Sequence, residues 1–298
     1  MKVWFPEFYM ECQRDDSHRE EIVREFLKHG VECVDNDHTD ISDCDLIFCG
    51  TFPTYHEVRK RRPRFPTIPA IFYCWDLYPF QFRGTTSEGK PTLQSCWWLE
   101  YVEEMRKACL VLVPSQCTVN RVHEIGGKNI NCKVVPSIVY PWDGEAFDGD
   151  YVMGVMREYQ DEPNLYLIKE SCLKLGIPFS DHKHRLSWED YQKSILGARV
   201  LISPYFEAST GGLSLLEGLW NGKHSLVARS PRNGVCDYLQ DKATYFDYDN
   251  RQEFEEKLVE LYNHPITHDV AECGQWIKSR YSTEVVVEQL VAHFRSVL

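Results

Sequence analysis

The sequence of 298 residues contains no apolar run of the roughly 18 residues that a membrane-spanning helix needs. It also has no leader-like start, because Pro6 and Glu7 interrupt the first apolar residues. No internal repeat and no low-complexity segment is visible. We therefore expect a globular protein with no transmembrane segment. If the protein contacts a membrane, we expect the contact to be peripheral.

Positive charge is scarce, since 33 Lys and Arg residues stand against 45 Asp and Glu residues, which gives a net charge of −12. This balance opposes non-specific binding to nucleic acids and to anionic membranes. The hydrophobic share of 43% and the charged share of 26% are those of an ordinary globular chain. The length corresponds to about two domains.

Motifs for metals and for common cofactors are missing. None of the 12 cysteines forms a C-x-x-C pair, and several, such as Cys74 and Cys109, lie in or beside apolar runs, where a thiol acts as a small hydrophobe. We therefore expect reduced cysteines and a cytoplasmic location. Among the Asp-x-Asp motifs, those that begin at Asp35, Asp148 and Asp247 each lie in a turn-rich stretch, so we expect none of these three to bind a metal. Neither G-x-G-x-x-G nor a Walker sequence occurs.

Short apolar runs alternate with segments of helical period, a pattern typical of an α/β fold with parallel sheets. The expected strands are residues 2–5, 45–49, 69–75, 109–113, 151–156, 200–204, 225–228 and 244–246. The expected helices are residues 17–29, 93–107, 115–126, 164–175, 187–196, 213–221, 251–262 and 282–298.

Residues 140–150 are rich in turn formers and acids and are typical of a linker. We therefore expect an N-terminal domain over residues 1–145 and a C-terminal domain over residues 146–280. Residues 281–298 form a last helix that we expect to cross back to the first domain.

The most informative stretch is residues 202–222, where a buried strand, a small-residue loop and a helix follow one another. We expect the backbone N–H groups of Gly211, Gly212 and Leu213 to converge there with the helix dipole behind them, which suits a phosphate. Glu217, one turn into the helix, is suited to accept hydrogen bonds from the vicinal hydroxyls of a ribose. Together they predict a nucleotide site. The alternative is an ordinary turn followed by a solvated glutamate.

This stretch is similar to the signature of retaining glycosyltransferases of the GT-B fold, in particular glycosyltransferase family 4. Residues 69–76, which end at Asp76, resemble the strand of that family that ends in a His-Asp pair, and the similarity covers most of residues 65–262. The resemblance implies two Rossmann-like α/β domains with parallel sheets that face each other across a cleft. It places the donor in the C-terminal domain and the acceptor in the N-terminal domain.

The resemblance also implies a chemistry. The donor is a nucleoside-diphosphate sugar, with a UDP-sugar as the default, and a hexosyl or pentosyl group is transferred with retention and without a metal or other cofactor. Arg157 matches the arginine that binds the diphosphate, and Asp76 is the candidate for orienting the acceptor.

Two departures from the family pattern keep alternatives open. Ser209 stands where the family has its first glutamate, so either Glu207 takes over that role or Ser209 and Thr210 offer neutral hydroxyls to the sugar. The second phosphate-binding cation, a lysine in the family, is also missing. Its possible replacements are Lys169, Lys183 and Arg185. These departures sustain the alternative of a non-catalytic protein that binds nucleotide sugars or nucleic acids.

The acceptor is open as well. A basic loop, formed by Arg59, Lys60, Arg61, Arg62 and Arg64, contradicts the acidic character of the chain and has aromatic neighbours, a mixture that suits nucleic acid. One interpretation is a hydroxymethylated base in DNA, the acceptor of small phage-type enzymes of this fold. The other candidate acceptors are a glycan or lipid-linked sugar, a small molecule and a protein. The alternative for the basic loop itself is a solvated loop without function.

Overall fold

The structure is a computed structural model. The residues that it describes are 1–6, 16–35, 40–50, 55–74, 93–140, 147, 149–155, 162–180, 187–203, 207–208 and 212–298. These residues divide into two compact units. Unit 1 comprises Met1–Ile138 and Arg280–Leu298, and unit 2 comprises Val139–Ser279.

Unit 1 contains a six-stranded parallel sheet in the order β2-β1-β3-β4-β5-β6. The strands are β1 Lys2–Trp4, β2 Glu32–Val34, β3 Leu46–Cys49, β4 Ala70–Tyr73, β5 Leu110–Val113 and β6 Cys132–Val134. β3, β4 and β5 are buried throughout, as apolar strands of a sheet covered on both faces should be.

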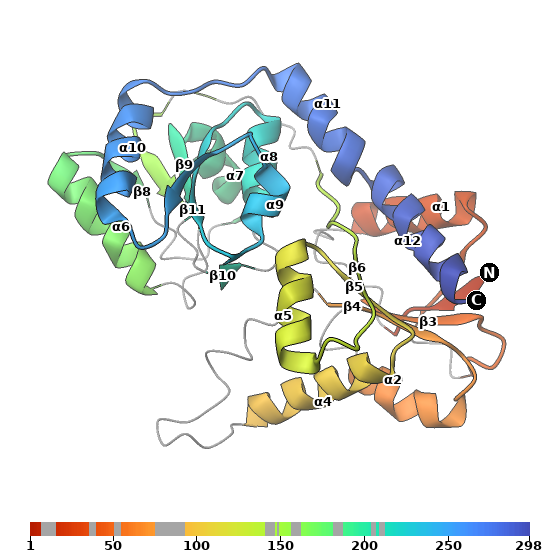
Figure 1. The fold of residues 1–298 in the computed structure, drawn as a ribbon. Helices are drawn as coiled ribbons and strands as arrows, with labels where there is room; N and C mark the ends of the chain where they lie inside the picture. The colour runs from red at the N-terminus through yellow and green to blue at the C-terminus, as the bar shows by residue number, and fades with distance from the viewer. Residues whose placement is uncertain are drawn as a thin grey trace. The chain divides into compact units, whose positions relative to one another are not determined.

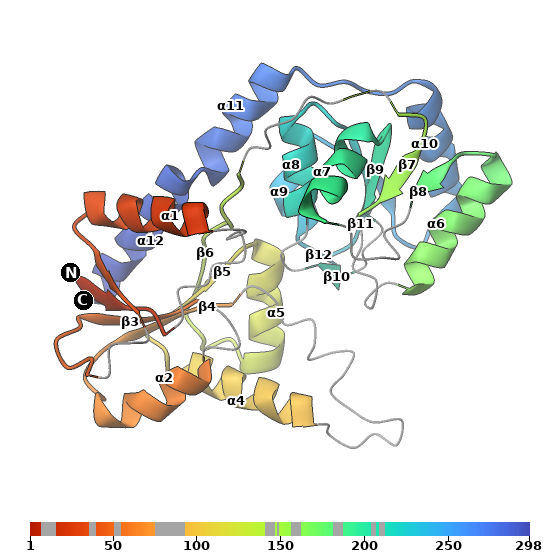
Figure 2. The same ribbon diagram turned by 180° about the vertical axis from the view of Figure 1, so that it is seen from behind.

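Helices cover both faces of this sheet (Figures 1 and 2). They are α1 Asp16–Lys28, α2 Tyr55–Arg61, the 3₁₀ turn Arg62–Arg64, α4 Leu93–Lys107, α5 Gln116–Gly126 and α12 Thr283–Val297. α1 and α12 lie side by side, with the rings of Phe26 and Phe294 stacked at 5.8 Å. On the other face, Tyr55 and Phe72 pack against Tyr101. Residues far apart in the sequence thus complete one core.

Unit 2 contains a five-stranded parallel sheet in the order β13-β11-β9-β7-β8. The strands are β7 Val152–Gly154, β8 Phe179–Ser180, β9 Val200–Ser203, β11 Ser225–Arg229 and β13 Thr244–Asp247. The chain passes from β7 to β8 on one side and then to β9 on the other, so the strand order reverses between β7 and β9. A separate parallel pair joins β10 Glu207–Ala208 to β12 Arg232–Asn233.

The helices of this part of the chain are α6 Glu162–Leu175, α7 Trp188–Gly197, α8 Leu213–Trp220, α9 Val235–Leu239, α10 Arg251–Asn263 and α11 Val270–Tyr281. Alternate residues of β9 lie on opposite faces of the sheet. Val200 and Ile202 belong to the core formed with α6 and α10, whereas Leu201 lies against α8. Ser203 therefore shares the α8 face with Leu201.

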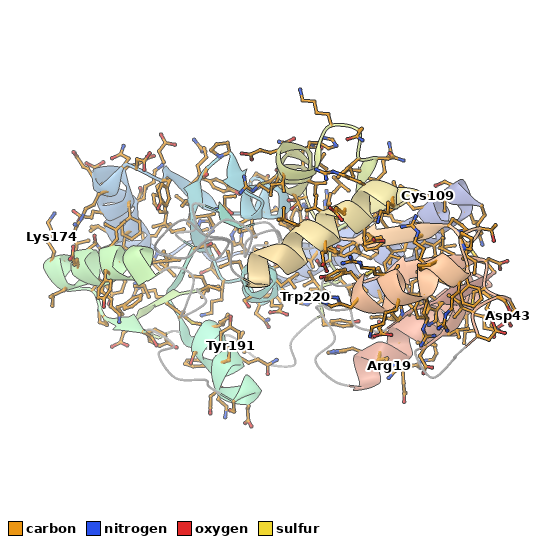
Figure 3. The ribbon with its side chains drawn as sticks, turned by 90° about the horizontal axis from the view of Figure 1, so that it is seen from below. Arg19, Asp43, Cys109, Lys174, Tyr191 and Trp220 are labelled. Atoms are coloured by element: carbon orange, nitrogen blue, oxygen red, sulfur yellow. The ribbon has the colours of Figure 1, made fainter. Side chains whose placement is uncertain are left out.

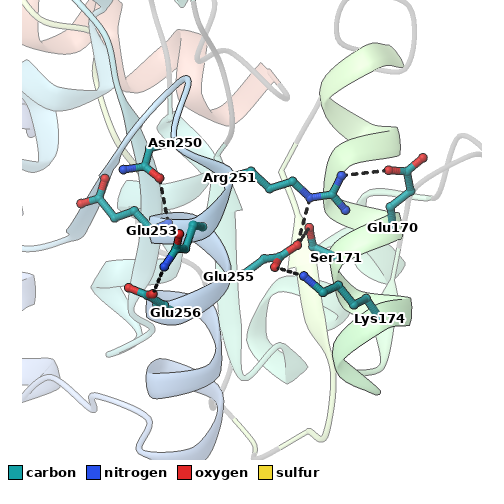
Figure 4. A network of polar contacts seen from close by, with 9 residues as sticks. Glu170, Ser171, Lys174, Asn250, Arg251, Glu253, Glu255 and Glu256 are labelled. Atoms are coloured by element: carbon teal, nitrogen blue, oxygen red, sulfur yellow. Dashed lines mark hydrogen bonds and ion pairs between the residues drawn. The ribbon is translucent and has the colours of Figure 1, made fainter.

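A polar network joins α6 to α10 (Figure 4). The carboxylate of Glu255 accepts hydrogen bonds from Lys174 at 2.5 Å, Ser171 at 2.9 Å and Arg251 at 2.9 Å, and Arg251 also donates to Glu170 at 3.2 Å. These contacts, Lys174 first, lower the pKa of Glu255 to about 2. The two helices are thus fixed to each other over the core of unit 2.

The predicted elements are confirmed to within about two residues at their ends, and Ser115 and Ser187 accept the N-capping hydrogen bonds of α5 and α7. One expectation is wrong: residues 59–64 are not a loop but the end of α2 and a 3₁₀ turn, because their cations find partners that permit a helix. The sequence pattern also did not indicate the helices α9 and α11 or the strands β2, β6, β8, β10 and β12. Among the described residues, no helix combines the length and the hydropathy of a membrane span.

Candidate functional site

The carboxyl edge of the unit 2 sheet contains the candidate site. β7 and β9 are neighbours there, with Gly154 paired to Ile202, and the strand order reverses between them. In open parallel sheets, ligands bind outside the carboxyl ends of the strands at such a switch point. The chain passes from β9 through β10 to α8, and α8 lies on the Leu201 face of β9. Because a helix that follows a parallel strand runs back along it, the first turn of α8 borders this point.

The first turn of α8 contains backbone N–H groups that have no acceptor within the helix. Gly212 is its N-cap residue, adopts a left-handed conformation with φ 98° and ψ 26°, and offers no side-chain cap. The first intrahelical bond of this end runs from the Leu216 amide to the Gly212 carbonyl at 2.8 Å. The N–H groups of the preceding turn thus have no acceptor four residues back in the helix, and with the helix dipole they suit an anion.

Glu217 lies one turn further along α8 and is 2% exposed. Its backbone carbonyl accepts a hydrogen bond from the Asn221 side chain at 3.0 Å. An ionised carboxylate has about four lone-pair sites for hydrogen bonds. Glu217 therefore combines a buried, fixed position with the capacity to accept hydroxyl groups.

Backbone pairing fixes the place of Glu207. β10 pairs with β12 so that Glu207 lies opposite Arg232. The Asn233 side chain holds β12 to the end of β11, because it donates to the Ala228 carbonyl at 2.7 Å and accepts from the Val235 amide at 3.1 Å. The backbone of Glu207 is thus held to the segment that follows β11.

Four residues of this region were missed by sequence reasoning, namely Tyr191, Ser203, Ser214 and Asn233. The hydroxyl of Tyr191 on α7, labelled in Figure 3, donates to Ser214 Oγ in the first turn of α8 at 2.7 Å. These residues are 23 positions apart on different helices, and no sequence pattern pairs them. Ser203 was recognised only as part of a strand.

The structure brings some predicted site residues together and leaves others undescribed. Gly212, Leu213 and Glu217 share the start of α8, and the backbone of Glu207 belongs to β10. Lys169 lies on α6. The predicted residues that lie outside the described ones are Asp76, Arg157, Lys183, Arg185, Ser209, Thr210 and Gly211.

The basic segment 59–64 is engaged within unit 1. Arg59 forms an ion pair with Glu100, which also accepts a hydrogen bond from Tyr55 at 3.1 Å. Lys60 pairs with Glu57 one turn earlier in α2 at 2.6 Å. The Arg59 contact joins α2 to α4, and the Lys60 contact lies within α2.

The next cations of the segment also have partners. The guanidinium of Arg61 lies 4.7 Å from the ring centroid of Trp4. Arg62 lies 3.6 Å from the carboxylate of the buried Glu104 and donates to the carbonyl of Lys107. Arg64 is exposed, and no ion pair to it is seen among the described residues. The segment therefore has a structural role in the packing of α2 and α4.

This role predicts unequal effects of two substitutions. Arg62→Ala is expected to lower the free energy of unfolding by about 1 kcal/mol, because Glu104 then keeps an ion pair only with Lys107 among the described residues. Arg64→Ala, the matched control, is expected to change it by less than about 0.5 kcal/mol. Urea unfolding measures both values. Equal losses in the two variants would contradict the assignment.

Among the described residues, no group of three or more His, Cys, Asp and Glu side chains is placed to hold a metal ion. The Asp-x-Asp motif at Asp247 lies at the end of β13, where the Asp247 carboxylate is 3.8 Å from Arg229 and its amide donates to Glu253 at 2.8 Å.

Comparisons with known proteins agree with this architecture. No protein-family model and no curated protein matches the sequence. Sucrose-phosphate synthase from Thermosynechococcus elongatus has a similar structure, with a TM-score of 0.71 and 8% identity over 99% of this chain and 98% of that chain. HepE from Anabaena, solved in complex with UDP and glucose, has a TM-score of 0.65 and 12% identity over 99% of this chain and 100% of that chain. The lipopolysaccharide outer core galactosyltransferase WaaB has a TM-score of 0.65 and 10% identity over 100% of both chains. At these identities the likeness establishes the fold, and the chain has the GT-B fold.

Proposed function

We propose that the protein is a glycosyltransferase that takes a sugar from a nucleoside-diphosphate donor, with a UDP-sugar as the default. The observation that carries the proposal is the coincidence of three features of unit 2. The strand order reverses between β7 and β9, the N-terminus of α8 lacks a side-chain cap, and Glu217 is buried one turn further on. The likeness to HepE, which was solved with UDP-glucose, supports the same reading.

In this proposal the diphosphate binds to the amides around residues 211–213, with Arg157 as its cation. Glu217 accepts the ribose hydroxyls. The donor sugar contacts Thr210 and either Glu207 or Ser209.

The proposed transfer proceeds with retention at the anomeric carbon. The bond from that carbon to the phosphate oxygen breaks, and a bond to the acceptor oxygen forms on the same face. The proton of the acceptor hydroxyl passes to the leaving phosphate oxygen, so the step needs neither a protein nucleophile nor a metal. The protein contributes alignment of the two substrates, with Asp76 on the acceptor, and stabilises the charge of the leaving diphosphate.

For the acceptor we propose a glycan or lipid-linked sugar. The hydroxymethylated base in DNA is weakened as a candidate, because Arg59, Lys60, Arg61 and Arg62 already have partners within unit 1. Binding to a DNA acceptor would fall steeply between about 50 and 200 mM salt. Transfer to a neutral oligosaccharide that does not depend on salt would exclude the DNA acceptor.

The test is nucleotide binding and turnover in Glu217→Gln. UDP at 100 times its dissociation constant is expected to stabilise the wild-type protein by about 2.7 kcal/mol in a thermal shift assay. Glu217→Gln is expected to weaken UDP binding about tenfold, since an acceptor of two hydroxyls loses its charge. The same change at the exposed Glu256 on α10 is the control and should leave binding unchanged.

Turnover separates the two candidate functions. Slow hydrolysis of UDP-glucose that is lost in Glu217→Ala would support the enzyme. Tight binding of UDP without turnover on any acceptor would favour the non-catalytic binding protein. Absence of binding to every nucleoside diphosphate would refute both.

A further inference from the structure

Two helices on one face of the unit 2 sheet run side by side in the same direction. Tyr191 on α7 meets Ser214 on α8 through a hydrogen bond of 2.7 Å. Four residues further along both helices, Ile195 lies 3.3 Å from the position that a Cβ atom would take at Gly218. Because residues four apart share a helix face, these contacts set α7 parallel to α8. Tyr191 is therefore fixed beside the first turn of α8.

The hydroxyl of Ser203 lies beneath the same turn. The Cβ position at Gly218 is 2.5 Å from Leu201 Cδ1, so this part of α8 covers Leu201. Ser203 is on the same face of β9, about 7 Å closer to the carboxyl end. A helix that follows a parallel strand runs in the opposite direction to that strand. The move from Leu201 to Ser203 along β9 therefore corresponds to a move from Gly218 toward Ser214 along α8.

Ser203 is 0% exposed, and its hydroxyl has no hydrogen-bond partner among the described residues. Buried hydroxyls are normally satisfied, because an unmade hydrogen bond in the interior costs free energy. An unsatisfied hydroxyl beneath a helix N-terminus that itself has no side-chain cap points to a ligand that supplies acceptors at this place.

We infer that Ser203 and Ser214 donate hydrogen bonds to a phosphate group of the bound nucleoside diphosphate, and that Tyr191 is a positioning residue for Ser214. The inference rests on the proposed function and deepens it. The Tyr191 hydroxyl donates to Ser214 Oγ, so Ser214 retains its own hydroxyl proton for another acceptor. Two neutral hydroxyls then supplement the backbone amides at the anion without adding charge.

Calorimetric titration with UDP and with uridine tests this inference, because only UDP carries the phosphates. Ser214→Ala is expected to weaken UDP binding about tenfold, and Ser203→Ala and Tyr191→Phe about threefold to fivefold each, with uridine affinity unchanged. Ser214→Thr keeps the hydroxyl and should bind UDP within about threefold of the wild-type protein. In the Ser214→Ala background, Tyr191→Phe should have no further effect, since the two act as one unit.

Tyr151→Phe is the matched control. It removes the hydroxyl of another tyrosine, which donates to the Ser194 carbonyl of α7 at 2.8 Å, nearer the other end of that helix. Its UDP affinity should equal that of the wild-type protein, and melting temperatures without ligand check that every variant folds. Wild-type affinity for UDP in Tyr191→Phe or Ser203→Ala, or an equal loss for uridine, would overturn the corresponding role. A wild-type protein that binds no UDP would instead refute the proposed function itself.

Discussion

Replacing Gly212 with alanine is expected to weaken UDP binding at least about tenfold and to lower the free energy of unfolding by about 2 kcal/mol. Gly212 has a φ of +98°, a conformation that L side chains rarely adopt. An added Cβ would lie 3.2 Å from Leu215 and 3.3 Å from Val235, so the backbone must turn or these neighbours must move. Either movement displaces the amides of the first turn of α8, on which the proposed diphosphate site depends.

Gly176→Ala is the control for this prediction. Gly176 follows α6 with a φ of +67°, but no atom lies within 4 Å of its Cβ position. The variant therefore carries backbone strain alone, which costs about 1 kcal/mol, and its UDP affinity should be unchanged. Urea unfolding and calorimetric titration measure both quantities. If Gly212→Ala bound UDP as tightly as the wild-type protein, the anion would not bind at this turn.

The strands and most helices were predictable because their signals are local. The apolar run at β5 and the capping serine before α5 each lie within a few residues of the element they define. α11 lacks such a signal, since its buried residues are only Cys273, Ile277 and Tyr281, a narrow stripe with one residue per turn. Burial of so narrow a stripe is decided by the surface it packs on, which the sequence does not display.

The candidate site was predictable only where one segment forms it. Gly212, Leu213 and Glu217 lie within six residues, so the loop and helix pattern predicts their place. Tyr191 and Ser203 reach the same turn through the parallel packing of α7 on α8 and through the pleat of β9. The basic segment shows the same limit, because Glu100 and Glu104, which bind Arg59 and Arg62, are some 40 residues away in the chain.

Acidification is expected to destabilise unit 2 through a pair of histidines, of which His224 is buried and His268 is half-buried. The His224 ring, 5% exposed, lies between His268 and Thr244, with Nδ1 2.8 Å from His268 Nε2 and Nε2 2.8 Å from Thr244 Oγ1. This chain of contacts joins the start of β11 to the start of β13 and to the segment that precedes α11. Burial first, and the neighbouring His268 second, lower the pKa of His224 from its usual 6.5 to about 4.

The sign of the effect follows from where the proton binds. The unfolded chain takes up a proton on His224 near pH 6.5, whereas the folded protein takes it up only near pH 4. Between these values the unfolded state binds more protons, so stability falls as the pH decreases, and the loss reaches about 3 kcal/mol at pH 4. Burial also lowers the pKa of His268, where nearby Lys242 acts in the same direction, so its contribution has the same sign.

The measurement is the free energy of unfolding in urea at pH 7 and at pH 4.5 for the wild-type protein, His224→Asn and His264→Gln. His224→Asn removes the titrating ring. Between pH 7 and pH 4.5 this variant should therefore lose about 2 kcal/mol less of its free energy of unfolding than the wild-type protein loses. His264 is exposed, and His264→Gln should keep the full dependence. Carboxylates such as Glu255, whose pKa is lowered to about 2, titrate in all three proteins and cancel in the comparison. If His224→Asn lost stability as steeply as the wild-type protein, the acid sensitivity would belong to another group.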